Sequence, residues 1–170
     1  MARRTPQPFS VSAVIPAFNA EASLARAIES ALAQTLPPDE IIVVDDGSSD
    51  NTKAEAEKFG KKVRYLRQEN GGPGQARNTG IQAAKSEWVA FLDSDDEWIG
   101  ERLEAQIDLV KRNPDLMWCG GNAVNNNRGV ETSRSNPDKA ACGLNGKDYF
   151  DHYLLAVGGG NIIEATNTFL

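Results

Sequence analysis

Short apolar runs alternate along this chain with segments of helical periodicity, and this alternation limits the fold more than any other feature. Each run is brief and most are rich in β-branched residues, which is typical of buried strands. The predicted strands are Val11–Ile15, Glu40–Val44, Val63–Leu66, Trp88–Leu92 and Leu116–Cys119. Strands separated by helices predict an α/β fold, a three-layer αβα sandwich around a mainly parallel central sheet.

The segments between these runs carry helix signals. Apolar residues recur at helical spacing from Leu24 to Leu32, with Asn19 as the expected N-cap and Pro37-Pro38 as the stop. The other predicted helices are a short one through Phe59 capped by Asp50 or Thr52, Gln75–Ala84, one that carries Leu103, Ile107 and Val110 and ends before Pro114, and Lys147–Val157.

A length of 170 residues predicts a single domain, residues 1–170. We expect residues 1–8 to be a flexible tail and the asparagine-rich stretch 122–139 to be a mobile loop. Gly158–Gly160 predicts a turn, and residues 161–170 are strand-like up to the last residue. We therefore expect the natural protein to continue beyond Leu170.

Charge and composition exclude several classes of protein. The 18 Lys and Arg against 24 Asp and Glu give a net charge of −6, which disfavours a general nucleic-acid binder. No apolar run approaches the ~20 residues of a membrane span, and none follows Arg3 as a secretory signal requires. Cys119 and Cys142 fit neither a metal site nor a disulfide framework. We expect a protein of the reducing cytoplasm, free there or peripheral to the cytoplasmic membrane face.

Acidic residues follow two of the predicted strands at the point where each ends. Asp45-Asp46-Gly47-Ser48 follows one strand, and Asp93-Ser94-Asp95-Asp96 follows another. The carboxyl ends of parallel strands form the ligand-binding edge of such a sheet. Grouped carboxylates repel one another, and a divalent cation with a preference for oxygen relieves that repulsion. Taken alone, the first group fits an ordinary turn, whereas the second, directly after a buried strand, predicts a functional site.

A glycine-rich segment, Asn70–Gly74, opens the helix that carries Arg77. Such a turn can approach a phosphate closely. It is not G-x-G-x-x-G, however, and Pro73 removes an amide donor, so a dinucleotide fingerprint is absent. This segment fits a plain helix start equally well. Arg77 is either a solvated charge or a bidentate phosphate ligand, and Trp98, after the acidic group, could line a pocket. With His152 as the single histidine, a general base is expected to be a carboxylate.

Four segments resemble the family 2 glycosyltransferases of the GT-A fold, and this resemblance implies a Rossmann-like three-layer αβα sandwich with a mainly parallel, mixed central sheet. The segments are Val14–Asn19, Ile42–Asp50, Asn70–Gly80 and Phe91–Asp96. Each is weak alone, but the four occur in order and at family spacing, between about Phe9 and Asn113.

The resemblance implies transfer of a sugar, with inversion, from a nucleotide-diphospho-sugar, expected to be a UDP-sugar, to a glycan, lipid or protein acceptor. It implies a divalent cation, Mn²⁺ or Mg²⁺, bound by Asp95, with Asp93 as a second candidate ligand. The residues implied at the nucleotide are Pro16 and Phe18 beside the base, Asp46 on the uracil ring with Asp45 supporting it, Arg77, Asp93 near the ribose, and Ser94.

The catalytic base is not assigned by the sequence. In the family it comes from a later acidic segment, which is not found here, since Glu164 is the one acid after His152. The other acids to search are Glu97 and Glu101. We therefore expect a donor-binding half without its acceptor half, and expect Asp50, on an outer turn, to matter little for nucleotide binding.

Three other classes of α/β protein fit the sequence less well than a glycosyltransferase does. A phosphoreceiver-like or other nucleotide-binding module that is not an enzyme remains the alternative, although the acids and basic residues of that fold fall at other strands. A nucleotidyltransferase needs a basic glycine-rich loop after the first strand, and residues 16–22 contain no Lys or Arg. A nicotinamide dehydrogenase is excluded by the missing fingerprint.

Overall fold

The computed structural model describes residues 9–113 and five short strand segments, 118–119, 124–127, 130–133, 142–143 and 161–163. The predicted tail 1–8, helix 147–157 and turn 158–160 lie outside the described residues, as do His152 and Glu164. None of the described helices is long and apolar enough to cross a membrane.

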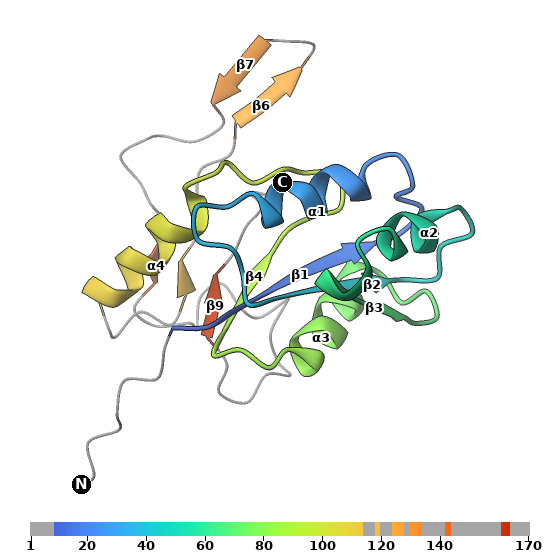
Figure 1. The fold of residues 1–170 in the computed structure, drawn as a ribbon, viewed down its shortest axis with the longest axis horizontal. Coiled ribbons are helices and arrows are strands. Elements are labelled where there is room, and N and C mark those ends of the chain that lie inside the picture. Colours follow the sequence, from blue (N-terminus) through green and yellow to red (C-terminus); the bar gives the residue numbers. More distant parts are fainter. Residues whose placement is uncertain are drawn as a thin grey trace, which may run out of the picture.

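A seven-stranded sheet forms the centre of the fold (Figure 1). Its strand order is β3-β2-β1-β4-β9-β5-β8, and all neighbouring pairs are parallel except β5 with β8. The strands are β1 Val11–Ala17, β2 Glu40–Asp45, β3 Val63–Arg67, β4 Trp88–Phe91, β5 Trp118–Cys119, β8 Cys142–Gly143 and β9 Asn161–Ile163. The predicted mixed, mainly parallel sheet is confirmed. The strand expected in 161–170 is confirmed for 161–163, which lie between β4 and β5.

Helices cover both faces of this sheet. They are α1 Leu24–Leu32, α2 Thr52–Glu57, α3 Pro73–Ala83 and α4 Arg102–Arg112, with a short 3₁₀ helix at Gly60–Lys62. Side chains of a strand alternate between faces. Ile15 and its alternate neighbours therefore pack in a core with α1, α2 and α4, while Val14 packs in a second core with α3. The three-layer sandwich follows from this alternation.

The first strand is longer than predicted, because it runs through Pro16 to Ala17. Val14 and Pro16 direct their backbone groups to the same side, since these groups alternate along a strand. The Val14 carbonyl accepts from Leu92 on the β4 side, where the register ends at Val14 and Phe91. The missing N–H of Pro16 therefore faces a place where the ladder has already ended. On the other side β1 continues with β2 as far as Ala17 and Asp45.

Two predicted helix caps are wrong. Helix α1 is preceded by Ser23 and not by Asn19, which adopts a left-handed backbone with φ 50° and contacts another loop. Helix α2 has Asn51 at its N-cap position and ends at Glu57 rather than Phe59. The residues predicted as caps instead form tertiary contacts, Asn19 with Ser49 and Asp50 with the Glu21 amide, which sequence spacing does not reveal.

The remaining helices and one loop differ from prediction in smaller ways. Helix α3 begins at Pro73, two residues early, because proline suits the first helical position. The predicted loop 122–139 is wrong for two segments: β6 Val124–Asn127 and β7 Val130–Ser133 pair antiparallel. Only two residues separate them and the second is Gly129, a spacing typical of tight hairpins that outweighs the polar composition.

Candidate functional site

The carboxyl ends of β1, β2, β3 and β4 lie at one edge of the sheet, because these strands are parallel. Phe18 follows β1 and is 52% exposed, while Asp46 follows β2 and is buried. The amide of Asp46 donates to the Ala17 carbonyl at 2.8 Å, so the ends of β1 and β2 are held side by side. Pro16 lies buried just before this edge, paired with Val44. The acids of the second motif follow β4 at the same edge.

The two adjacent acids at the end of β2, Asp45 within the strand and Asp46 just after it, serve opposite faces of the sheet, as consecutive strand residues do. Asp45 contacts Tyr65, which packs against the core of α1, α2 and α4. Asp46 contacts Gly71 and Gly72, at the start of α3 on the other face. Asp45 and Asp46 therefore have separate partners and separate tasks.

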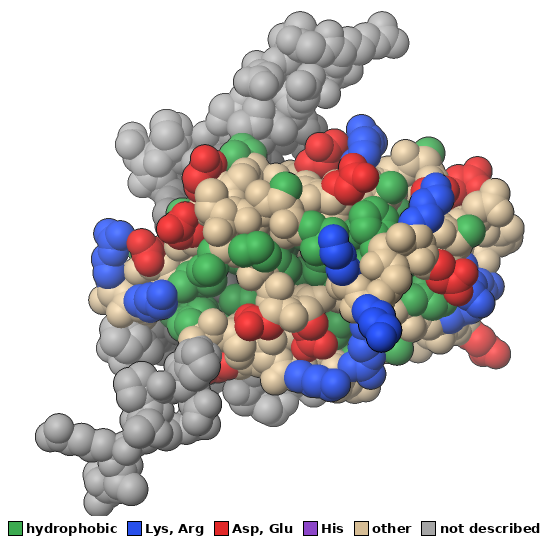
Figure 2. All heavy atoms as spheres, in the orientation of Figure 1, with side chains coloured by type: hydrophobic (Ala, Val, Ile, Leu, Met, Phe, Trp, Pro, Cys, Tyr) green, Lys and Arg blue, Asp and Glu red, His purple; other side chains and the backbone are tan. Residues whose placement is uncertain are grey.

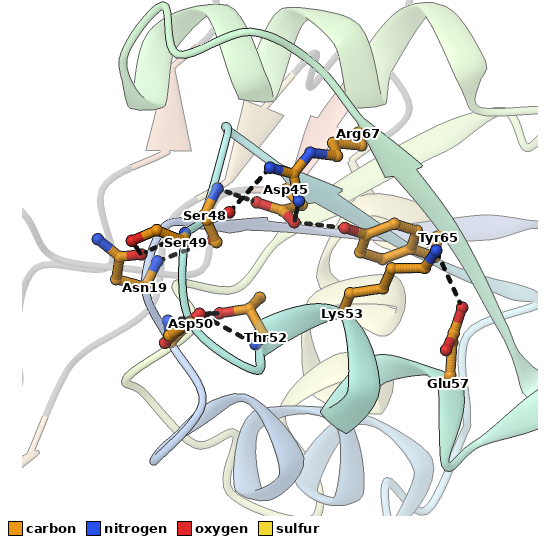
Figure 3. Close-up of polar contacts among 11 residues, drawn as sticks. Asn19, Asp45, Ser48, Ser49, Asp50, Thr52, Lys53, Glu57, Tyr65 and Arg67 are labelled. Carbon is orange, nitrogen blue, oxygen red and sulfur yellow. Dashed lines mark hydrogen bonds and ion pairs between the residues drawn. The ribbon is translucent and has the colours of Figure 1, made fainter.

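Asp45 is fully buried and holds β2 to β3 (Figure 3). Its carboxylate accepts hydrogen bonds from the Tyr65 hydroxyl, from the Ser48 amide at 2.7 Å and from Arg67 at 3.3 Å. Burial alone would raise the pKa of Asp45, but these bonds outweigh it and leave the pKa lowered. Burial, followed by the bond to Asp45, raises the pKa of Tyr65 to about 12. The arrangement keeps Asp45 ionised and Tyr65 protonated.

A second set of contacts in Figure 3 joins the loop after β1 to the loop after β2. The side-chain oxygen of Asn19 accepts from the Ser49 amide at 2.9 Å. Asp50 accepts from the amide and the hydroxyl of Thr52, which is fully buried, and from the Glu21 amide at 3.0 Å. Asp50 therefore supports the loops beside the site, and its loss should destabilise them; its small effect on nucleotide binding stays a prediction.

Asp46 anchors the glycine-rich segment. One carboxylate oxygen, Oδ1, accepts from the Gln68 side-chain amide at 2.7 Å and from the Gly71 amide at 2.9 Å. The other, Oδ2, accepts from the Gly72 amide at 2.8 Å. Gly47 is required beside it: its φ is +84°, and a Cβ there would lie 3.1 Å from the Asn70 backbone nitrogen. The glycine-rich segment thus lies against Asp46, and α3, which begins there, starts beside the site.

The same helix reaches the second acidic motif through Arg77. Its guanidinium lies 2.5 Å from the Asp93 carboxylate, and the two side chains are 16% and 20% exposed. The guanidinium also lies 6.0 Å from the centre of the Phe91 ring. Arg77 is therefore not a solvated helix charge. Helix α3 connects the two motifs, Asp46 at its N-terminus and Asp93 one turn later.

Ser94 and Asp95 lie in a turn that is closed by a hydrogen bond from the Asp96 amide to the Asp93 carbonyl at 3.1 Å. Ser94 is half-buried and Asp95 exposed. Loss of solvent, then the charges of Asp95 and Asp93, raise the pKa of Asp96, which shows an excess of negative charge here. Within the described residues no group of three His, Cys, Asp or Glu side chains could hold a metal ion. These carboxylates suit Mg²⁺ or Mn²⁺ only if a bound ligand completes the coordination.

Trp98 does not line a pocket: it is 6% exposed and packs in the core of α1, α2 and α4. Glu97 forms an ion pair with Arg26 at 3.5 Å, with both side chains more than half exposed, and Glu101 is exposed at the N-cap position of α4. Acidic and basic side chains are interspersed over the face seen in Figure 2, so this face offers no broad positive surface to a phosphate backbone.

Sequence reasoning missed Gln68 and Thr79. Gln68 follows β3 at the same edge, and its side chain lies between Asp46 and the Thr79 hydroxyl. Its position two residues after the predicted strand Val63–Leu66 was a usable signal, but an uncharged residue there attracts less notice than an acid.

Comparison with known proteins agrees with this geometry. The family model for glycosyl transferase family 2 matches residues 12–163. The chain belongs to glycosyl transferase family 2. WfgD of Escherichia coli, a UDP-Glc:alpha-D-GlcNAc-diphosphoundecaprenol beta-1,3-glucosyltransferase, is 39% identical over 122 residues, which are 70% of this chain and 48% of WfgD. The succinoglycan biosynthesis protein ExoW of Rhizobium meliloti is 38% identical over 131 residues, 71% of this chain and 41% of ExoW. The chain thus spans less than half of either relative.

The fold of this family member also matches solved structures. The crystal structure of residues 1–349 of Staphylococcus aureus TarS superposes with a TM-score of 0.63 at 31% identity, covering 71% of this chain and 38% of that one. The same TarS fragment has been solved in complex with UDP and with UDP-GlcNAc. The GT-A fold expected from the sequence is confirmed.

Proposed function

We propose that this chain binds the nucleotide-sugar donor of a glycosyltransferase, with a UDP-sugar as donor. The observation that carries the proposal is the position of α3, whose preceding glycines bind Asp46 and whose Arg77 binds Asp93. The two acidic motifs are thereby fixed at one edge, beside the exposed ring of Phe18. The UDP and UDP-GlcNAc complexes of TarS and the UDP-Glc donor in the name of WfgD support the choice of uridine.

The roles of the site residues in this proposal follow from their contacts. Phe18 offers an exposed aromatic face against which a base can stack. Asp46 has acceptor capacity left for a base N–H, and Asp45 supports it from the other face of the sheet. Arg77 and Asp93 form a rigid pair that orients the ribose side of the nucleotide, with Pro16 and Ser94 completing the edge.

Asp95 is the proposed ligand of a divalent cation, Mn²⁺ or Mg²⁺, with Asp93 as a second. The exposed Asp95 carboxylate leaves room for phosphate oxygens as further ligands. The chemistry supplied by such a cation is Lewis-acid neutralisation of the charge that develops on the departing diphosphate. The acceptor hydroxyl must be deprotonated by a carboxylate, and no described acid is assigned that task. The acceptor remains a glycan, a lipid or a protein.

The experiment is a calorimetric titration of UDP into the wild-type chain and into Asp95→Ala, each in manganese. We expect Asp95→Ala to weaken binding by about tenfold or more, because the carboxylate that shares the cation with the diphosphate is gone. Asp108→Ala is the matched control, since it removes an exposed aspartate of α4 that pairs only with Arg112 at 3.6 Å. Equal losses in the two variants would contradict the role assigned to Asp95.

A further inference from the structure

Gln68 lies at the carboxyl edge of the sheet, and the proposed function assigns it no role. It follows β3 directly, and its side chain is half-buried between β2 and α3. Its side-chain nitrogen donates to Asp46 Oδ1 at 2.7 Å, and its side-chain oxygen accepts from the Thr79 hydroxyl at 2.6 Å. Its backbone amide donates to the Asp45 carbonyl at 2.9 Å. Both ends of its amide and its backbone are therefore engaged.

The orientation of the Gln68 amide is fixed by chemistry. Asp46 is a carboxylate and accepts hydrogen bonds, so it requires the NH₂ end of the amide. The opposite end must then be the carbonyl, and the Thr79 hydroxyl donates to it. A reversed amide would place its oxygen against the Asp46 carboxylate and lose that bond, whereas the Thr79 hydroxyl can donate or accept. Asp46 thus determines which end of Gln68 faces it, and Thr79 on α3 holds the other end in place.

The contacts of Asp46 leave one direction open. A carboxylate oxygen accepts about two hydrogen bonds. Oδ1 already has two, from Gln68 and Gly71, whereas Oδ2 has one, from Gly72. Asp46 is only 3% exposed, so little of its surface is accessible to a ligand. What remains is a single acceptor position on Oδ2, held in place by three donors.

We infer that Gln68, held in place by Thr79, is a positioning residue that aims the free lone pair of Asp46 and so sets which nucleobase the site accepts. The inference rests on the proposed function. A fixed acceptor favours a ring nitrogen that carries a hydrogen, as N3 of uracil does. It disfavours cytosine, whose N3 is an acceptor and meets the carboxylate lone pair unpaired.

The test compares the affinities of UDP and CDP for the 170-residue chain by calorimetry in manganese. The wild-type chain should prefer UDP by at least about tenfold, because a site built around one polar partner rejects the analogue that lacks it. Thr79→Val removes the hydroxyl at nearly constant volume and should reduce the UDP-to-CDP ratio by about threefold or more. Gln68→Leu should reduce it further. Thr79→Ser, which keeps the hydroxyl, should restore the wild-type ratio.

The matched control is Thr35→Val, which removes another hydroxyl that donates to a side chain, Glu104 at 2.7 Å, between the end of α1 and α4. It should leave the ratio unchanged. A measurement without substitution guards against variants that fail to fold: the Gln68 side-chain amide proton that is donated to Asp46 should exchange slowly with solvent in the wild-type chain, because Asp46 accepts it while Thr79 holds the carbonyl end of the same amide. Rapid exchange would overturn the inference.

The outcomes separate the inference from the proposed function. A wild-type chain that binds no nucleoside diphosphate overturns both. A wild-type chain that prefers UDP, with the same ratio in Thr79→Val and in Gln68→Leu, overturns the inference and leaves the proposed function standing. A purely structural role for Gln68 would lower the stability of the variants without changing the ratio.

Discussion

Gly80 lies where α3 packs tightly against β1, and replacing it with alanine should move the helix. A Cβ at Gly80 would lie 2.3 Å from Val14 Cγ1 and 3.1 Å from Val14 Cγ2. Carbon atoms in contact normally lie about 3.5–4.0 Å apart, so the first distance is short by about 1.2 Å. Val14 is fully buried in the centre of the sheet and has no space to move into. The strain must therefore displace α3.

The expected change in the free energy of unfolding is the difference between two contributions. Overpacking of a core costs about 1–3 kcal/mol, and alanine in place of glycine within a helix returns about 1 kcal/mol. The difference is a net cost of about 0–2 kcal/mol. Because the 2.3 Å approach to Val14 is severe, we expect Gly80→Ala to lie at the upper end, with a loss of about 2 kcal/mol in the free energy of unfolding and a fall of several degrees in Tm. Displacement of α3 also moves Gly72 and Arg77 relative to Asp46 and Asp93, so UDP binding should weaken in the same variant.

Urea denaturation followed by circular dichroism measures the effect. Gly74→Ala is the matched control, because it lies in the same helix and a Cβ there meets nothing within 4 Å; it should be neutral or stabilising. Val14→Ala removes both clashing methyl groups, so the double variant should be more stable than the sum of the single changes predicts, by about 0.5–3 kcal/mol. A Gly80→Ala variant as stable as Gly74→Ala, or an additive double variant, would refute the reasoning.

Four further predictions concern the polar contacts beneath the site. Tyr65→Phe leaves the buried Asp45 one donor short and should cost about 1–3 kcal/mol; urea denaturation near pH 7 measures it. In the wild-type chain the lowered pKa of Asp45 adds stability that is present above pH 3.8 and lost as the pH falls below it, and Tyr65→Phe should move acid unfolding to higher pH. Tyr65, with its pKa raised from 10.0 to about 12, adds stability that is present below pH 10 and lost between pH 10 and 12, and this alkaline loss should be smaller in Tyr65→Phe. Asp50→Ala should lower Tm more than Asp108→Ala does, since only Asp50 bonds across loops, and equal Tm values would contradict this.

The parts of the fold that depend on periodicity could be predicted from the sequence. Short apolar runs rich in β-branched residues, separated by helical segments, located the strands. Such runs arise because a central parallel strand buries both of its faces, as in Glu40–Val44. The edge that carries Asp46 and Asp93 also followed, since acids directly after parallel strands must meet there. Pro16 shows the limit of this reasoning. Its tolerance depends on where the β1–β4 ladder ends, which is a tertiary fact.

The contacts within the candidate site could not be predicted in the same way. Asn19 resembles a helix cap in sequence, but it bonds to Ser49, 30 residues away, and no local rule selects that partner. That Asp45 and Asp46 face opposite sides of the sheet follows from the two-residue period of a strand. Their bonding partners could not be predicted, because these come from β3 and from the start of α3.

The measurement that tests the account most directly locates the bound nucleotide and cation on the molecule. Amide spectra of the ¹⁵N-labelled chain, recorded with UDP and with Mg²⁺ or Mn²⁺, report both at once. We predict that UDP with Mg²⁺ shifts the amides of Phe18, Asp46 and Gly72, and that Mn²⁺ broadens those around Asp95. The amides of Lys85 and Ser86, which bond to Glu40 and Ser12 at the other end of the strands, should stay unchanged. Shifts and broadening centred on Lys85 and Ser86, or none at the carboxyl edge, would contradict the central claim.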